Sequence, residues 1–266
     1  MEAIRPTAVA GLFYPASSQA LLDMIEKNLQ QVELPANFKL PKALIVPHAG
    51  YIYSAPIAAS AYTLLQAYRQ QIKRVVLIGP SHRVSFNGLA LCSADFFSTP
   101  LGQIAIDKTA QSQISSIEGV GLLDQAHADE HSLEVQLPFL QFILDDFTIV
   151  PIVAGNASPK LVEKLINSLW GGPETLVVIS SDLSHYHDYR SAQQLDRNTS
   201  QSIVDLDIDA VDSQHACGCV GIRGLLSFAQ HHPLNVSILD VRNSGDTAGD
   251  KDRVVGYGAY CFTEVA

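Results

Sequence analysis

Short, almost uninterrupted apolar runs alternate with segments of helical periodicity along this chain, and they constrain its fold more than any other feature. The runs occupy residues 43–46, 75–78, 148–153, 176–179 and 236–241. Because neither face of such a run is polar, we expect each one to form a strand buried on both faces. Strands of this kind need helices on both sides. The pattern therefore predicts an α/β fold: a three-layer α/β/α sandwich around a mixed, largely parallel sheet.

Helical periodicity predicts where the covering helices lie, at residues 18–32, 55–68, 132–144, 158–170 and 219–230. The fourth has the clearest boundaries, since Ser158 is a natural N-cap, Pro159 suits the first helical position and Gly171 and Gly172 can end the helix. Two segments of more alternating character, 101–107 and 254–262, are predicted to be antiparallel or edge strands. Because no linker, repeat or low-complexity segment divides the sequence, we expect residues 1–266 to form one domain.

Composition excludes several classes of protein. Of the 266 residues 47% are hydrophobic and 17% are charged, which is unlike a disordered chain. The net charge of -10 and the lack of a Lys/Arg cluster argue against binding to nucleic acid or to an anionic membrane. The sequence has neither an apolar run of about 20 residues nor a secretory signal, so we expect a soluble, cytoplasmic protein. The sequence leaves the oligomeric state open.

The four cysteines do not form a disulfide framework. Cys92 and Cys261 lie in apolar strand-like runs and are predicted to be core residues. Cys217 and Cys219 open a glycine-rich helix, where the helix N-terminus would lower the pKa of a thiol and make it a nucleophile or a soft metal ligand. The alternative, at least for one of the two, is a small buried residue that packs where glycines let backbones approach.

Three histidines follow apolar runs directly: His48, His82 and His185. In an open α/β sheet, ligands bind beyond the carboxyl ends of the strands, so these imidazoles can converge if their strands are parallel neighbours. Neutral imidazole is a common ligand of zinc, iron and copper. For any single histidine, the alternative is a loop residue that bonds a backbone carbonyl.

Further polar residues accompany these histidines. Asp182 precedes His185 by three positions, and it either orients that imidazole as a general base or caps the next helix. Asp129 and Glu130 are expected to be first-turn acids of a helix that begins near residue 132. A cation is disfavoured there, so His131 is expected to be neutral and to face the crevice as a substrate-binding or supporting group.

Four of these motifs, taken in order, resemble the Memo family (mediator of cell motility; AmmeMemoRadiSam system protein B in prokaryotes). They are Pro47-His48-Ala49-Gly50-Tyr51, Gly79-Pro80-Ser81-His82, Asp129-Glu130-His131-Ser132-Leu133-Glu134 and Ser180-Ser181-Asp182-Leu183-Ser184-His185. The likeness extends from Arg5-Pro6 to the Gly256-Tyr257-Gly258 region. The family is in turn similar in fold to the LigB-type class III extradiol dioxygenases, which use non-haem Fe(II).

The resemblance implies that His48 and His82 bind a metal, that Cys217 is its thiolate ligand, and that Asp182 and His185 are pocket residues. The dioxygenases have a carboxylate in place of the cysteine, so the likeness does not by itself imply ring cleavage. Members of the family are described as redox-active metal proteins and, in animals, as binders of phosphotyrosine peptides. The expected ligand is a small molecule or a peptide.

These observations leave three functional hypotheses. The first is a metal-dependent oxidoreductase, dioxygenase-like, that holds Fe(II) or copper, with zinc possible, and uses His185, Asp182 and His131 for catalysis. The second is a non-enzymatic module that binds a peptide or small anion in the same crevice. The third, a hydrolase with a Cys217–His185 nucleophile pair, has less support because no G-x-S-x-G elbow is present.

Overall fold

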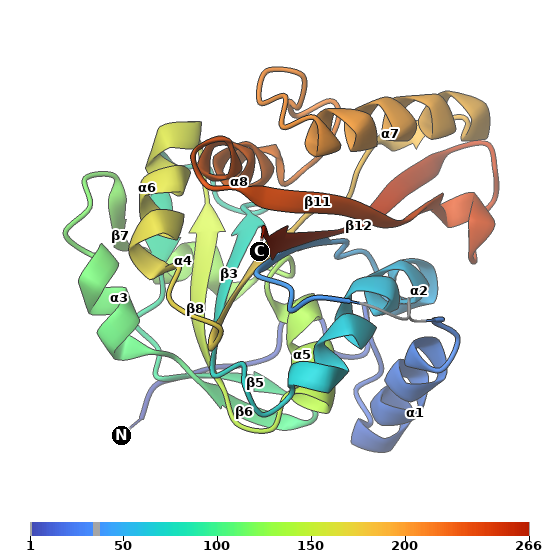
Figure 1. Cartoon of the computed structure of the whole chain (residues 1–266). Helices are drawn as coiled ribbons and strands as arrows, with labels where there is room; N and C mark the ends of the chain where they lie inside the picture. The colour runs from blue at the N-terminus through green and yellow to red at the C-terminus, as the bar shows by residue number, and fades with distance from the viewer. Residues whose placement is uncertain (1, 34–37, 266) are drawn as a thin grey trace.

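A computed structural model describes residues 2–33 and 38–265 of the protein (Figure 1). Its main sheet has the strand order β10-β12-β2-β9-β3-β8-β4-β7, and β11 pairs with β12. The strands of this sheet are β2 (Ala43–Val46), β3 (Arg74–Pro80), β4 (Leu89–Leu91), β7 (Val120–Leu122), β8 (Thr148–Ala154), β9 (Thr175–Ser180), β10 (His185–His187), β11 (Leu234–Asn243) and β12 (Val254–Glu264). A smaller sheet contains β1 (Ile4–Arg5), β5 (Phe96–Thr99) and β6 (Gly102–Ala105).

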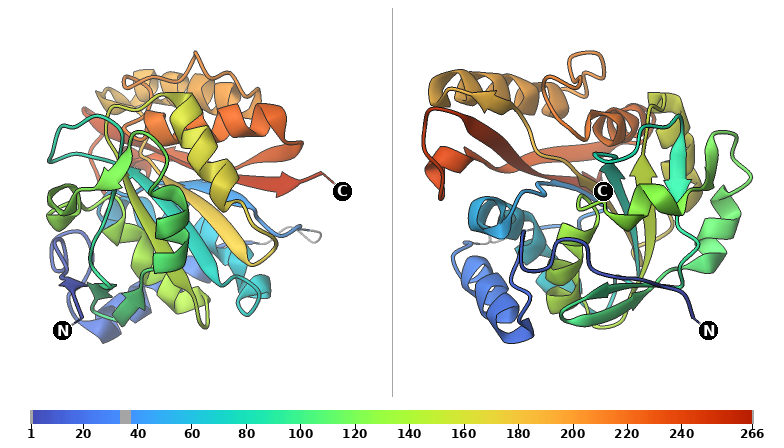
Figure 2. Two further views of the ribbon diagram at one scale, coloured as in Figure 1. Left: turned by 90° about the vertical axis from the view of Figure 1, so that its left-hand side faces the viewer. Right: turned by 180° about the vertical axis from the view of Figure 1, so that it is seen from behind.

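Helices cover both faces of the main sheet (Figures 1 and 2). The α-helices are α1 (Ser18–Leu29), α2 (Tyr51–Tyr62), α3 (Lys108–Ile114), α4 (Asp124–Ala128), α5 (Leu137–Ile143), α6 (Pro159–Leu169), α7 (Tyr189–Val204) and α8 (Cys219–His231). The 3-10 helices are η1 (Thr63–Tyr68), η2 (Glu134–Gln136) and η3 (Ser244–Asp246). The predicted α/β class and mixed sheet are confirmed.

The central strands are buried on both faces because alternate side chains enter two separate cores. On β3, Val75 and Leu77 join a core with α1, α2 and α5, whereas Val76 and Ile78 join a core with α6 and α8. The parallel pairings β2–β9, β9–β3 and β3–β8 hold these strands in one register. The predicted doubly buried strands are therefore correct for the centre of the sheet.

The prediction is wrong for residues 236–241. These residues belong to β11, which pairs only with β12 among the described strands and exposes 44% of Ile238. Periodicity could not identify it, because the half-exposed face of this edge strand also carries apolar residues. The alternating segment at 254–262 is antiparallel, as predicted, but β12 is flanked by strands on both sides.

Helix boundaries follow local sequence chemistry. Ser158 caps α6 by accepting a hydrogen bond from the Leu161 N–H, as predicted. The helix predicted from residue 132 begins only at Leu137, after the turn η2, so Asp129 and Glu130 are not its first-turn acids. Helix α7 was not predicted, because its sequence is largely polar and few of its side chains are buried.

The glycines of α8 let it approach its neighbours closely. A Cβ atom on Gly224 would lie 2.2 Å from Cβ of Val162 on α6, and one on Gly221 would lie 3.0 Å from a methyl group of Ile179 on β9. These contacts support the packing interpretation of the small residues in this helix. Cys92 and Cys261 are buried core residues, as predicted.

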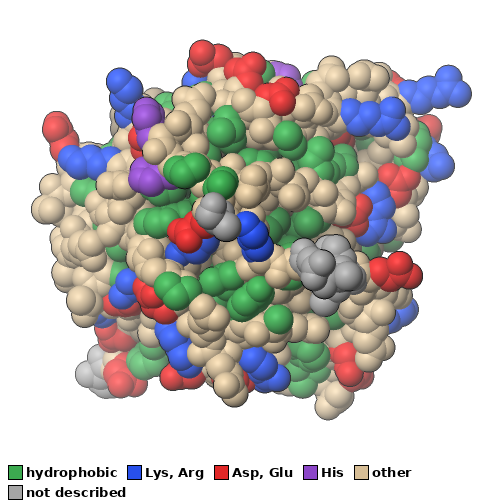
Figure 3. All heavy atoms as spheres, in the orientation of Figure 1, with side chains coloured by type: hydrophobic (Ala, Val, Ile, Leu, Met, Phe, Trp, Pro, Cys, Tyr) green, Lys and Arg blue, Asp and Glu red, His purple; other side chains and the backbone are tan. Residues whose placement is uncertain are grey.

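The surface in the orientation of Figure 1 mixes charges of both signs. Lys and Arg side chains are interspersed with Asp and Glu on this face (Figure 3). None of the helices within residues 2–33 and 38–265 is long and apolar enough to cross a membrane.

Candidate metal centre

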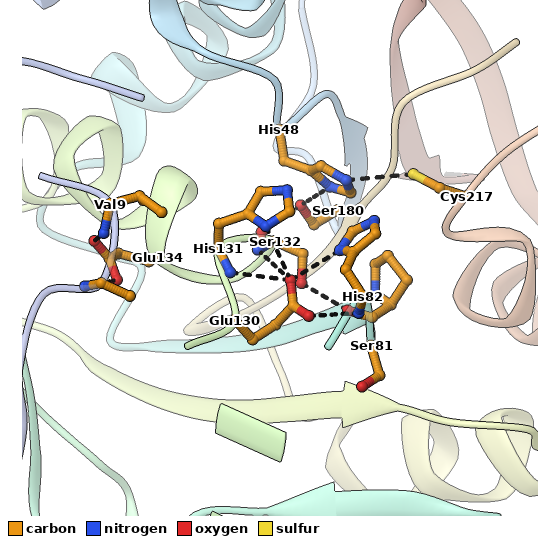
Figure 4. Close-up of polar contacts among 12 residues, drawn as sticks. Val9, His48, Ser81, His82, Glu130, His131, Ser132, Glu134, Ser180 and Cys217 are labelled. Carbon is orange, nitrogen blue, oxygen red and sulfur yellow. Dashed lines mark hydrogen bonds and ion pairs between the residues drawn. The ribbon is translucent and has the colours of Figure 1, made fainter. Parts of the chain in front are cut away.

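Three histidines converge at the carboxyl edge of the central strands. The strands β2, β9 and β3 are parallel neighbours, so the loops that follow them begin at the same edge. His48 follows β2 and His82 follows β3, and His131 joins them from the loop between α4 and η2. One potential ligand atom from each ring lies within 4.8 Å of the others, and Figure 4 shows the rings facing one another.

Hydrogen bonds fix the orientation of the His48 ring. Its Nδ1 lies 2.9 Å from Oγ of Ser180, and this hydroxyl donates its own hydrogen to the carbonyl of Ser132 at 2.6 Å. The Ser180 oxygen must therefore accept from His48, so Nδ1 carries the hydrogen. The free lone pair is on Nε2, which lies 3.3 Å from Sγ of Cys217 (Figure 4).

A carboxylate fixes the His82 ring in the same way. Oε1 of Glu130 lies 2.9 Å from Nδ1 of His82, and the carboxylate also accepts the backbone N–H groups of His82, His131 and Ser132. An ionised carboxylate only accepts, so Nδ1 of His82 carries the hydrogen and Nε2 is free. Burial raises the pKa of Glu130, but the hydrogen bonds and charge of His82 and the Ser132 N–H outweigh it and lower the pKa to about 2.

His131 contributes an imidazole that is neutral and incompletely bonded. Its Nδ1 is buried and makes no hydrogen bond to the described residues, although Oε1 of Glu130 lies 3.4 Å away. The ring stacks on His82 with centroids 4.6 Å apart and contacts Phe13. Burial and the proximity of His82 lower the pKa of His131 to about 4, so it is neutral near pH 7, as expected from the sequence. Burial likewise holds the pKa of His48 well below its usual value.

Cys217 faces the cluster from the loop that precedes α8. Its Sγ accepts the backbone N–H of Asp182 at 3.3 Å. Gly218 follows as the N-cap residue of α8, and a Cβ there would lie 2.6 Å from the carbonyl oxygen of Ser180. The expectation of a lowered thiol pKa is wrong: burial raises the pKa of Cys217, and the neighbouring Asp182 carboxyl raises it further. Burial also raises the pKa of Cys219.

Asp182 and His185 lie beside the cluster, but no hydrogen bond joins them in the described part of the chain. The Asp182 carboxylate instead accepts the backbone N–H of His48 at 2.7 Å. Burial raises the pKa of Asp182 to about 7, although hydrogen bonds from the backbone N–H groups of His48 and Ala49 act to lower it. The third strand-end histidine, His185, does not belong to the three-histidine cluster. Its pKa is lowered mainly by burial.

Two cavities open beside the cluster. Cavity A has a volume of about 410 Å³, and the lining residues that matter here are Tyr53, His131, Asp182, His185, Tyr186 and Arg253. Cavity B has a volume of about 430 Å³, and those that matter are His82, Arg83, Asn156, Cys217, Cys219 and Val220. The two cavities share no lining residue.

Sequence reasoning missed the residues that support the cluster. Arg5 donates to the backbone carbonyls of Glu130 and His127 and pairs with buried Glu134, which anchors the N-terminal segment to the loop that carries His131. Ser180 and Glu130 were visible in the sequence only as neighbours of the predicted residues. Their roles follow from contacts between distant segments.

The residues present fit a transition metal. Three imidazoles and one thiol form a set of nitrogen and sulfur donors, which suits zinc, iron or copper rather than magnesium or calcium. The buried Nδ1 of His131 makes no hydrogen bond within the described protein, although Oε1 of Glu130 lies 3.4 Å from it. In both His48 and His82, Nδ1 bonds a neighbouring oxygen and leaves Nε2 free, which is the arrangement expected for a metal-binding histidine.

Comparison with known proteins identifies the family. The model of the family "Memo-like protein" matches residues 5–261. A MEMO1 family protein of Ignicoccus hospitalis is 37% identical, covering 97% of this chain and 98% of that protein. MEMO1 family proteins of Thermoplasma volcanium and Thermotoga petrophila are 33% and 34% identical, covering 96% and 95% of this chain and 97% of each relative. With its strand-end histidines, its cysteine and these matches, the chain belongs to the Memo-like protein family.

Proposed function

We propose that this protein binds a redox-active metal and uses it for oxidoreductase or oxygenase-type chemistry on a small molecule. His48, His82 and Cys217 are the proposed ligands, and His131 is a further donor. The observation that supports this most directly is the fixed orientation of the His48 and His82 rings, which form one cluster with His131, together with the contact of the Cys217 thiol with Nε2 of His48. Fe(II) or copper is the proposed metal, and zinc also suits the donors.

The protein side chains have separate tasks in this proposal. A bound iron or copper ion would supply one-electron chemistry and Lewis acidity. Asp182 can hold or release a proton near neutral pH, since its pKa is about 7 and it lines cavity A. His185 lines the same cavity as a neutral acceptor. Access by water differs across the cluster, because His48 is almost completely covered whereas His82 is exposed.

Metal content is the direct test of this proposal. The protein is purified without an affinity tag under anaerobic conditions, and metals are measured in the parent and in the His48→Ala, His82→Ala double variant. We expect about one metal per chain in the parent and none in the double variant. His231→Ala serves as the control, because His231 is the last residue of α8 and its ring lies against the Ser227 carbonyl. Full metal content in the double variant would refute the proposal, and circular dichroism verifies that the variant is folded.

The second candidate is a binding module for a peptide or small anion in the same crevice. Cavity A favours it as well, since it combines aromatic walls with an arginine. This candidate predicts that ligand affinity is unchanged by a chelator. The hydrolase candidate is weaker, because the raised pKa of Cys217 does not suit an activated nucleophile.

A further inference from the structure

Tyr186 has a backbone conformation that bulky residues seldom adopt. Its φ is +63°, and it is one of two non-glycine residues with positive φ among those described. It lies in β10 between His185 and His187, where the pairing with β12 shifts register. Such strain persists only where surrounding structure imposes it, and it is concentrated at functional sites. Tyr186 is 64% exposed, so it lies outside the core and lines cavity A.

Arg253 lies against this ring. Its guanidinium carbon is 5.0 Å from the centroid of Tyr186, and both residues line cavity A. Among residues 2–33 and 38–265, no carboxylate forms a salt bridge with Arg253 and no acceptor bonds its guanidinium. The nearby Asp250 carboxylate accepts the backbone N–H groups of Asp252 and Arg253 instead. The ring thus orients a guanidinium whose donors are free.

We propose that cavity A binds a small organic monocarboxylate, with its carboxylate on Arg253 and its apolar body between the rings of Tyr186 and Tyr53. A guanidinium matches a carboxylate in a bidentate geometry. The volume of about 410 Å³ suits a small molecule. His131, Asp182 and His185 line the same cavity, so the body of the ligand would extend toward the groups that the proposed function uses. This inference names the substrate class of that function and rests on it for the chemistry.

The other charged groups favour a monoanion over a phosphate. Asp182 and Asp250 also line cavity A, and Arg253 is the single Arg or Lys in its described lining. A phosphate ester carries a charge of about -1.5 to -2 at neutral pH, so two acidic side chains in a lining with one guanidinium would repel it more strongly than a carboxylate. A phosphorylated ligand is therefore the competing outcome.

The test uses three probes of similar shape: benzoate, the neutral benzamide and phenyl phosphate. Binding to the full-length protein is measured by calorimetry or ligand-observed NMR at fixed ionic strength. We expect benzoate to bind at least about tenfold more tightly than benzamide and more tightly than phenyl phosphate. Arg253→Gln should weaken benzoate binding by about tenfold or more, whereas Arg83→Gln in cavity B should leave it unchanged. Equal affinity for benzoate and benzamide, or preference for phenyl phosphate, would overturn the inference.

Variants of Tyr186 test whether its ring contributes to binding. Asn tolerates positive φ, so Tyr186→Asn removes the ring while keeping the backbone conformation, and it should weaken benzoate binding. Tyr186→Phe should bind benzoate like the parent. Metal content is measured in each variant and in the His48→Ala, His82→Ala protein. If the parent contains no metal but benzoate binding depends on Arg253, the proposed function fails and this inference stands. If benzoate binding is lost with the metal but not with Arg253→Gln, the inference is wrong.

Discussion

Sγ of Cys217 lies 3.3 Å from Nε2 of His48, the one nitrogen of that ring that is not engaged by Ser180. Burial raises the pKa of this thiol and so favours its protonated form. A bound cation would reverse this, since a coordinating thiol loses its proton to the metal charge. The contact therefore places a sulfur that would become a thiolate on metal binding beside Nε2 of His48, which already has a free lone pair for a metal.

The first prediction concerns the two cysteines of the Cys217-Gly218-Cys219 segment. Cys217→Ser should lower metal content or metal affinity by at least about tenfold, because the soft sulfur ligand is lost. Cys219→Ser should retain the metal, since Cys217 is the cysteine that contacts His48. Metal analysis and competition with a chelator distinguish the two. If Cys219→Ser loses the metal and Cys217→Ser keeps it, the ligand assignment is wrong.

A second prediction concerns the hydroxyl that fixes His48. Ser180→Ala removes the acceptor for Nδ1–H and should reduce metal affinity by about 10- to 100-fold without displacing a ligand. Ser184→Ala is the matched control, because the Ser184 hydroxyl is buried with no partner among the described residues. It should leave metal affinity unchanged and should not lower stability. Equal affinities in the two variants would show that the tautomer of His48 is not set by Ser180.

The third prediction concerns the glycine between the two cysteines. In Gly218→Ala the new methyl group would lie 2.6 Å from both the Ser180 carbonyl oxygen and Cβ of Ser181, so the loop must move. We expect a loss of stability of about 1–3 kcal/mol together with weaker metal binding. Gly121→Ala is the control, since a Cβ there meets nothing within 4 Å. Urea unfolding and metal analysis measure both effects, and wild-type behaviour of Gly218→Ala would contradict the close packing.

The sequence was sufficient to predict the edge of the sheet at which the site lies. Strand-end histidines converge because parallel neighbours end together, and this placed His48 and His82 correctly at one edge. Proximity within that edge depends on loop conformation, which periodicity does not describe. His131 therefore joins the cluster from a loop that follows a helix, whereas His185 lines cavity A without belonging to the cluster.

The supporting interactions could not be predicted for a different reason. Glu130 lies next to His131 in the sequence, yet its carboxylate acts on His82, 48 residues away. Similarly, the thiol pKa of Cys217 was expected to fall at a helix N-terminus, but burial dominates. Both outcomes depend on tertiary packing and on how much solvent it removes. Composition and motif spacing carry no information on either quantity.

The last prediction concerns Asp196 of α7, which is 1% exposed and accepts the backbone N–H of Ser184 in the loop that leads to His185. Burial raises the pKa of Asp196 from 3.8 to about 6, although the hydrogen bond from the Ser184 backbone N–H lowers it. Because the folded pKa exceeds the unfolded value, this group contributes stability that is fully present below pH 3.8 and is lost as pH rises to about 6. The loss amounts to about 3 kcal/mol.

Asp196→Asn keeps a neutral side chain at every pH and should therefore remove this dependence. The variant should match the parent at about pH 3.5 and be more stable by up to about 3 kcal/mol at about pH 8, a range set by the pKa shift. Urea unfolding of the metal-free protein across this range measures the difference. Asp209→Asn, whose side chain is 97% exposed, should show no such trend. A difference between Asp196→Asn and the parent that does not grow with pH would mean that Asp196 is ionised at little cost, with water reaching its carboxylate behind the His185 loop.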